Sequence, residues 1–169
     1  MGLYRRRGLA VASSLLGPRL RAEAEDATQS AVIRCYRALD QFRADSSFAG
    51  WFFRIVRNEA LAVKARARHR VPHMDDEALA ELSAPDLTPE QAALRSQMQT
   101  DLQRAIERLP VPYQAAVRLY YGQDWSVDEI AEALATPANT IKSYLLRSRQ
   151  LLRSLLSQQG YGHDHPTEP

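Results

Sequence analysis

The chain has 169 residues, of which 45% are apolar and 25% charged, and its formal net charge is +2. These proportions are typical of soluble globular proteins, and they exclude a wholly disordered, a collagen-like or a disulfide-rich chain. Cys35 is the only cysteine, so no internal disulfide is possible, and its apolar neighbours predict a small core residue. No stretch is long and apolar enough to predict a membrane span. So small a charge excess argues weakly against a polyanionic partner, although an average can conceal segments of opposite charge.

The charges are distributed unevenly along the chain. Residues 1–70 hold 14 Lys or Arg against 6 Asp or Glu, a net charge of +8, whereas residues 71–100 carry −5 and residues 101–169 carry −1. The start of the acidic part contains Pro72 and Pro85 and shows little periodicity, which is typical of a flexible linker. The expected division is a basic domain over 1–70, an acidic linker over 71–87, a second domain over 88–157 and a disordered tail over 158–169.

The N-terminal segment has some features of an export signal. Arg5-Arg6-Arg7 precedes a short apolar run, as in the basic region of a signal peptide. Arg19 and Arg21, however, place charge where a signal peptide is neutral. We therefore expect a helix with a basic face rather than an export signal.

The periodicity is helical throughout, which predicts an all-α fold of two small helical domains joined by the acidic linker. Apolar residues recur on one side over 22–40 and 47–68, and a capping box at Thr88 and Gln91 opens a further helix over 88–109. The residues expected on the buried faces are Ala24, Ala27, Ala31, Val32, Cys35, Tyr36 and Leu39, then Phe48, Trp51, Phe52, Ile55 and Val56, then Leu94, Met98, Leu102, Ala105 and Ile106.

The stretch from 126 to 156 predicts a helix-turn-helix. Ser126 and Glu129 form a capping box that opens a short helix, and Thr136-Pro137 begins a longer one after a turn of a few residues. A plain helical hairpin with a solvated basic face is the alternative, but the tight turn, the two caps and the lack of acidic residues in the second helix favour DNA binding. In such motifs the N-terminal half of the second helix enters the major groove. We expect this helix to present Asn139, Thr140, Ser143, Tyr144 and Arg147 to base edges, and Lys142, Arg149 and Arg153 to phosphates.

Aromatic and basic residues are interleaved over 42–70. This pattern suits single-stranded nucleic acid, because cations follow the backbone and rings receive unstacked bases. Aromatic residues at helical spacing are, however, more often part of a core, and we assign Trp51, Phe52 and Ile55 to the core. The basic face from Arg57 to Arg70 is then the better candidate for contact.

Two parts of the chain resemble, in the same order, the two conserved domains of the extracytoplasmic-function (ECF) sigma factors of the sigma-70 type. The first resemblance is carried by Glu25-Asp26-Ala27-Thr28-Gln29, Ala38-Leu39-Asp40-Gln41-Phe42-Arg43, Ser46-Ser47-Phe48 and Trp51-Phe52-Phe53-Arg54-Ile55-Val56-Arg57-Asn58. The second is carried by Leu109-Pro110, Ala115-Ala116-Val117, Leu119-Tyr120-Tyr121 and Thr140-Ile141-Lys142-Ser143. The two matches lie on either side of the acidic linker and together cover most of the chain.

The resemblance implies a dissociable subunit of bacterial core RNA polymerase that directs transcription initiation at promoter DNA, in a stress or envelope response and under an anti-sigma factor. It implies a cytoplasmic protein without catalytic residues, metal or cofactor. The domain over 1–70 would be region 2 and that over 88–157 would be region 4. Polymerase docking would then fall to Asp26, Gln29 and Ile33, capture of the minus-ten element to Arg43, Ser46, Ser47, Arg54, Arg57 and Asn58, and reading of the minus-thirty-five element to Asn139, Thr140, Lys142, Ser143, Tyr144, Arg147 and Arg149.

The chain also departs from the family pattern. It starts about one helix-length later than usual, so we expect region 2 to be shortened at its N-terminus. Ser30 stands where the docking helix is normally acidic, and Ala135 replaces the usual turn glycine, where a positive φ would strain a residue with a Cβ. The alternative function is therefore a sigma-like regulator that binds DNA or an anti-sigma factor without supporting initiation. A further hypothesis is that the linker carboxylates imitate nucleic acid near the polymerase active-site channel, through Asp75, Asp76 and Glu77.

Overall fold

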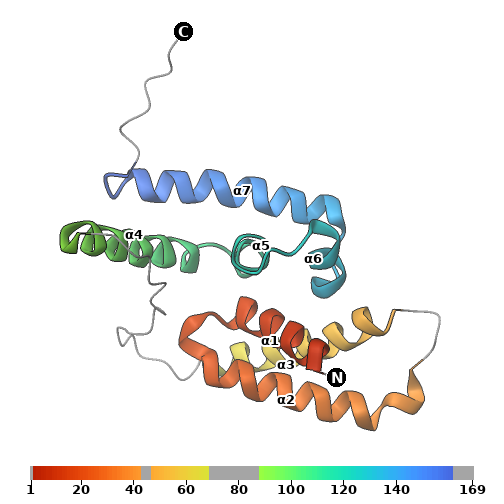
Figure 1. The fold of residues 1–169 in the computed structure, drawn as a ribbon. Coiled ribbons are helices and arrows are strands. Elements are labelled where there is room, and N and C mark those ends of the chain that lie inside the picture. The colour runs from red at the N-terminus through yellow and green to blue at the C-terminus, as the bar shows by residue number, and fades with distance from the viewer. Residues whose placement is uncertain (1, 43–46, 69–87, 162–169) are drawn as a thin grey trace.

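The computed structural model describes residues 2–42, 47–68 and 88–161, and all regular structure in these ranges is helical (Figure 1). The all-α fold expected from the sequence is confirmed. The first half contains α1 (Gly2–Leu16), the 3-10 turn η1 (Pro18–Leu20), α2 (Arg21–Arg37), the 3-10 turn η2 (Leu39–Gln41) and α3 (Phe48–Ala67). The second half contains α4 (Pro89–Glu107), α5 (Val111–Gly122), α6 (Val127–Leu134) and α7 (Ala138–Ser157). The linker expected over 71–87 lies outside the described residues.

The first four residues of the expected tail belong to the folded part of the chain. Residues 158–161 form a turn after α7, and the Tyr161 hydroxyl donates a hydrogen bond to Asp101 Oδ2 of α4 at 3.0 Å. The expected disorder therefore does not apply to these four residues, and residues 162–169 lie outside the described ranges.

Helices α1, α2 and α3 pack together as a three-helix unit. The helix predicted in place of an export signal is α1, which buries Val11 and Leu15 and leaves Arg5 and Arg6 exposed. Gly8 lets α1 approach α3 closely, because a Cβ at this position would lie 3.0 Å from the Phe52 ring. The unit thus depends on a small residue on α1 facing a large aromatic ring on α3.

The prediction for α2 was right for its small residues and wrong at its C-terminal end. Ala31 and Cys35 are fully buried, as expected, but Tyr36 is 74% and Leu39 is 45% exposed. Tyr36 is rotated about 100° from Cys35 around the helix axis, which carries it off the buried stripe. Leu39 follows the end of the helix, in η2, so the helical period no longer places it.

The apolar stripe predicted along α4 is buried only near its C-terminal end. Ala105 is 1% exposed, whereas Leu94 is 71%, Met98 is 54% and Leu102 is 38% exposed. The helix packs against α7 and α5, and neither covers the N-terminal part of the stripe (Figure 1). The prediction was therefore wrong for these three residues, because periodicity reports an apolar face without showing that another element covers it.

The two halves pack against each other along one continuous hydrophobic core, with α1 against α5 and α3 against α6. At its centre the rings of Phe53 and Trp125 have centroids 5.9 Å apart. Arg7 of α1 lies over the Trp125 ring at 4.2 Å and pairs with Glu129 of α6 at 2.6 Å. We call this contact between the two halves the seam. None of the helices in the described ranges has the length and apolar character needed to cross a membrane.

Candidate nucleic-acid interface

The predicted helix-turn-helix is formed by α6 and α7, and its turn contains an unusual backbone conformation. The Ser126–Glu129 capping box is present, with Glu129 N donating to Ser126 Oγ at 3.3 Å. Ala135 ends α6 with φ 48° and ψ 49°, the left-handed conformation expected from the family's turn glycine. Thr136 N then donates to Ala131 O at 2.9 Å, and α7 begins after Pro137. The sequence therefore fixes the angle between the helices with a capping box on one side of the turn and a proline on the other.

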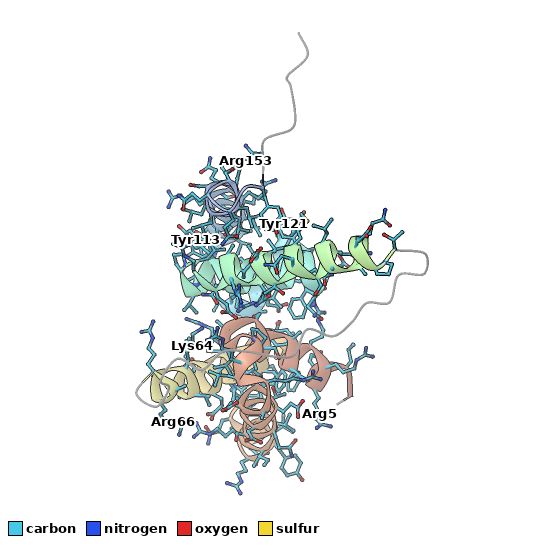
Figure 2. The ribbon with its side chains drawn as sticks, turned by 90° about the vertical axis from the view of Figure 1, so that its left-hand side faces the viewer. Arg5, Lys64, Arg66, Tyr113, Tyr121 and Arg153 are labelled. Carbon is cyan, nitrogen blue, oxygen red and sulfur yellow. The ribbon has the colours of Figure 1, made fainter. Side chains whose placement is uncertain are left out.

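The exposed face of α7 carries most of the residues predicted to meet DNA. Its inward face is apolar. Its exposed polar groups are of the amide, hydroxyl, ammonium or guanidinium type, with no carboxylate on the helix, and Leu146 and Leu151 are exposed as well. The Ser143 hydroxyl donates to Asn139 O at 3.0 Å, so its oxygen lone pairs remain free to accept. The exposed predicted residues are Asn139, Lys142, Ser143, Arg147 and Arg149, and Arg153 continues the same basic face (Figure 2).

Thr140 and Tyr144 are less accessible than predicted. Both are half-buried, and the Tyr144 ring packs on Tyr113 of α5 with centroids 4.9 Å apart. The Arg147 Nη1 lies 3.5 Å from the Tyr113 hydroxyl, and this hydrogen bond raises the pKa of Arg147. Tyr113 therefore orients the guanidinium beside the exposed face. The sequence analysis missed Tyr113, because nothing local links it to a partner 31 residues later.

Region 42–58 of the first half supplies a second group of predicted DNA contacts at the start of α3. Ser47 caps this helix, accepting a hydrogen bond from Gly50 N at 2.9 Å, and its hydroxyl donates to Glu132 of α6. Arg54 and Asn58 are exposed one helical turn apart, while Arg57 is half-buried. The structure therefore brings Arg54 and Asn58 onto one accessible face, but Ser47 is engaged at the seam. The predicted contacts Arg43 and Ser46, and Arg70 of the basic face, lie outside the described residues.

The aromatic residues at the start of α3 divide into a buried and a half-exposed set. Phe52 is 1% exposed, which confirms it as core, and Phe53 is 2% exposed at the seam. Trp51 is half-buried and packs on Phe42, which precedes α3, with ring centroids 5.1 Å apart. Ile55 is half-buried. Trp51 and Ile55 pack against the buried core, in line with their assignment from the sequence, and leave part of their surface exposed.

The predicted docking residues lie on one exposed face of α2. Asp26, Gln29 and Ile33 are spaced at i, i+3 and i+7, so they share one side of the helix, and all three are exposed. Ile33 is 43% exposed, and the misassigned Tyr36 extends the apolar part of this face. An apolar stripe bordered by polar groups is typical of a surface that binds another protein.

Comparisons with known proteins agree with this layout. The family description "Sigma-70 region 2" matches residues 2–70, and "Sigma-70, region 4" matches residues 99–152. The RNA polymerase sigma-H factor of Pseudomonas aeruginosa is 31% identical over 145 residues, covering 79% of this chain and 73% of the relative. The ECF RNA polymerase sigma factor SigW of Bacillus subtilis is 31% identical over 144 residues, covering 79% of this chain and 75% of the relative. The ECF RNA polymerase sigma-E factor of Escherichia coli is 33% identical over 138 residues, covering 75% and 70%. The chain belongs to the ECF family of RNA polymerase sigma factors.

Two solved structures have a similar fold. RpoE from Bartonella quintana, in complex with the anti-sigma factor NepR, gives a TM-score of 0.59 at 24% identity and covers 92% of each chain. CnrH, in complex with the cytosolic domain of CnrY, gives 0.56 at 21% identity and covers 90% of this chain and 82% of CnrH. At this identity the likeness shows the fold, and it extends over both regions.

No metal centre is evident among the described residues, where no group of three or more His, Cys, Asp or Glu side chains is placed to hold an ion. Cys35 is fully buried, as predicted, and burial raises the pKa of its thiol. A buried thiol with a raised pKa is a poor nucleophile.

Proposed function

We propose that this sigma factor directs bacterial core RNA polymerase to promoters, with α7 reading the minus-thirty-five element and the start of α3 capturing the minus-ten element. The observation that carries this proposal is the helix-turn-helix whose second helix exposes basic and amide groups without a single carboxylate. Regions 2 and 4 occur in family order, and the relatives are named RNA polymerase sigma factors. The protein then acts as a non-catalytic initiation factor in the cytoplasm, in a stress or envelope response.

On α7 the exposed side chains suggest a division of roles. Arg147 is oriented by Tyr113 and can donate two parallel hydrogen bonds to a guanine edge, while Asn139 and Ser143 can reach neighbouring bases. Lys142 and Arg149 are exposed, and the ammonium group of the first and the guanidinium group of the second suit contacts with phosphates. Thr140 and Tyr144 are half-buried and serve mainly to position the helix.

In region 2 we assign docking on polymerase to the face of α2 that holds Asp26, Gln29 and Ile33. Arg54 and Asn58 are the accessible DNA contacts on α3, with Arg57 beside them. Ser47 becomes available to DNA only when its bond to Glu132 of α6 is broken. An anti-sigma factor is a further partner. The similar structure of RpoE contains the anti-sigma factor NepR, and that of CnrH contains the cytosolic domain of CnrY.

Promoter binding by both regions requires the seam to open. The minus-thirty-five and minus-ten elements are centred about 25 base pairs apart, which is about 85 Å along B-form DNA. In the structure the start of α3 contacts α6 directly, through the bond from the Ser47 hydroxyl to Glu132. The closed arrangement therefore cannot place α3 and α7 on both elements at once.

Docking through α2 is tested by measuring the affinity of the purified chain for core RNA polymerase. Ile33→Asp places a charge in the apolar part of the docking face and is expected to weaken binding by about tenfold or more. Leu3→Asp is the matched control, because Leu3 is 66% exposed on α1 and away from this face. Equal affinity of the Ile33→Asp and Leu3→Asp variants would overturn the assignment of the docking face.

A further inference from the structure

A basic cleft lies on the seam, between the end of α1, the end of α3 and the start of α5. It has a volume of about 390 Å³ and is lined by four cationic side chains from three segments of the chain. Arg19 comes from η1, Lys64 from α3, Arg68 from the position directly after α3, and Arg118 from α5. Figure 2 shows Lys64 at the level of the seam, with Arg66 farther from it on the same helix. Both halves of the molecule thus contribute charge to one concave site.

The positive charge of the cleft exceeds what the residues described by the structure neutralise. Glu107 is the one carboxylate among the described residues that line it, and it pairs with Arg19 at 3.4 Å. The end of α1 also contributes, because Arg118 Nη1 donates to Ser14 O at 3.1 Å and Lys64 donates to Leu15 O. A helix end carries roughly half a negative charge, so about two and a half of the four positive charges remain.

Two further observations show that, within the described part of the chain, the charges of these cations are only partly compensated. Arg118 Nη2 is buried without a hydrogen-bond acceptor, although its other terminal nitrogen has two. Burial lowers the pKa of Lys64, and so do the neighbouring Arg118 and Arg68. Like charges crowded at a partly buried site raise the free energy of the folded state unless an anion compensates them.

We propose that this cleft binds a small phosphate-bearing anion. Several guanidinium and ammonium donors converging from different directions suit the many acceptor oxygens of a phosphate or pyrophosphate group. The volume lies within the range of small-molecule sites, so it also admits an organic group attached to the phosphate. Such a ligand neutralises the positive charge that Lys64 and Arg68 bring to the cleft.

The anion would also favour the closed arrangement of the two halves. Arg19, Lys64 and Arg68 belong to the first half and Arg118 to the second, so the complete site exists only while the seam is closed. A ligand that binds one of two states more tightly shifts the equilibrium towards that state. If both regions must separate at a promoter, as the proposed function requires, the anion opposes promoter binding.

Binding is tested with inorganic pyrophosphate and the full chain, following the thermal unfolding midpoint at constant ionic strength. We expect a saturable rise in the midpoint for the wild-type chain, and at least tenfold weaker binding for Lys64→Gln and Arg68→Gln. Arg66→Gln makes the same charge change on the same helix, but Arg66 does not line the cleft, so its binding is expected to match wild type. Lys64→Gln also removes a helix cap, so the exposed Arg68 provides the variant whose folding is least affected.

Three results would overturn the proposal. They are an unchanged midpoint in the wild-type chain, equal loss of binding in Arg66→Gln and Arg68→Gln, or an effect that chloride at equal ionic strength reproduces. A short DNA duplex at equal phosphate concentration tests whether the ligand is a free small anion or the DNA backbone. We expect Arg68→Gln to weaken the binding of pyrophosphate but not the binding of the duplex. The assay contains no polymerase, so its failure leaves the proposed role in transcription untouched.

Discussion

The turn of the helix-turn-helix allows a sharp test, because Ala135 adopts a left-handed conformation with φ 48° and ψ 49°. That conformation costs a residue with a Cβ roughly 1–2 kcal/mol, and glycine avoids most of this cost. Glycine in turn makes the unfolded chain more flexible, which offsets about 0.4–1 kcal/mol. Ala135→Gly is therefore expected to raise the free energy of unfolding by about 0.5–1 kcal/mol, and the thermal midpoint by about 1–4 °C.

Ala131→Gly is the matched control. Ala131 lies in the interior of α6 with helical backbone, so the same chemical change there is expected to lower the free energy of unfolding by about 1 kcal/mol. Urea unfolding of the two variants beside the wild-type chain measures both effects. A loss of stability in Ala135→Gly equal to that in Ala131→Gly would refute the left-handed turn as a source of strain.

The remaining predictions concern the seam and α7. Arg7→Ala removes the ion pair with Glu129 and the cation–π contact with Trp125, which are both partly exposed. Urea unfolding is expected to show a free energy of unfolding lower by about 0.5–1.5 kcal/mol. The control Arg5→Ala, on the same helix, is expected to change this free energy little. Hydrogen bonds from Ser126 N–H and from Arg7 lower the pKa of Glu129. The ion pair between Arg7 and Glu129 therefore contributes its full stabilisation of the folded state above pH 4.5, the ordinary pKa of the carboxyl group. This contribution is lost as the pH falls through the lowered pKa. Arg147→Ala is expected to weaken promoter DNA binding by about 1–3 kcal/mol and to relax specificity at one base pair in a fluorescence titration. Arg149→Ala is instead expected to weaken binding equally across sequences and to reduce the salt slope by about one.

The helices of the second half were predictable because their signals are local. The capping boxes at Thr88–Gln91 and Ser126–Glu129 are both present in the structure, and each links residues three apart. The left-handed turn at Ala135 was also anticipated, from the family resemblance at that position. Short-range hydrogen bonds and backbone preferences thus place α4, α6 and α7 without knowledge of tertiary contacts.

The seam was not predictable from the sequence for the opposite reason. Arg7 and Glu129 are 122 residues apart, and Arg118 reaches Ser14 across 104 residues. No spacing rule connects such pairs, because they depend on how the two halves pack. The same limit explains the error at Leu94, whose apolar face is regular in sequence but uncovered in the fold.

The candidate site shows a similar division. The exposure of most α7 residues follows from helical periodicity, since Ile141 and Leu145 fix the inward side. The packing of Tyr144 on Tyr113 does not, because it joins two helices. The engagement of Ser47 by Glu132 is likewise a tertiary contact, and it occupies the hydroxyl proton of an exposed, predicted DNA contact. Periodicity therefore identifies a binding face, whereas tertiary packing decides which of its residues are free.

The central claim is tested most directly by run-off transcription with bacterial core RNA polymerase and this chain as the sole sigma factor, on promoter fragments from its own genome. We predict transcripts from a specific subset of promoters, reduced by Arg147→Ala and by Ile33→Asp but not by Leu3→Asp. Binding of the chain to DNA or to an anti-sigma factor without any transcript would contradict the account and would identify a sigma-like regulator instead.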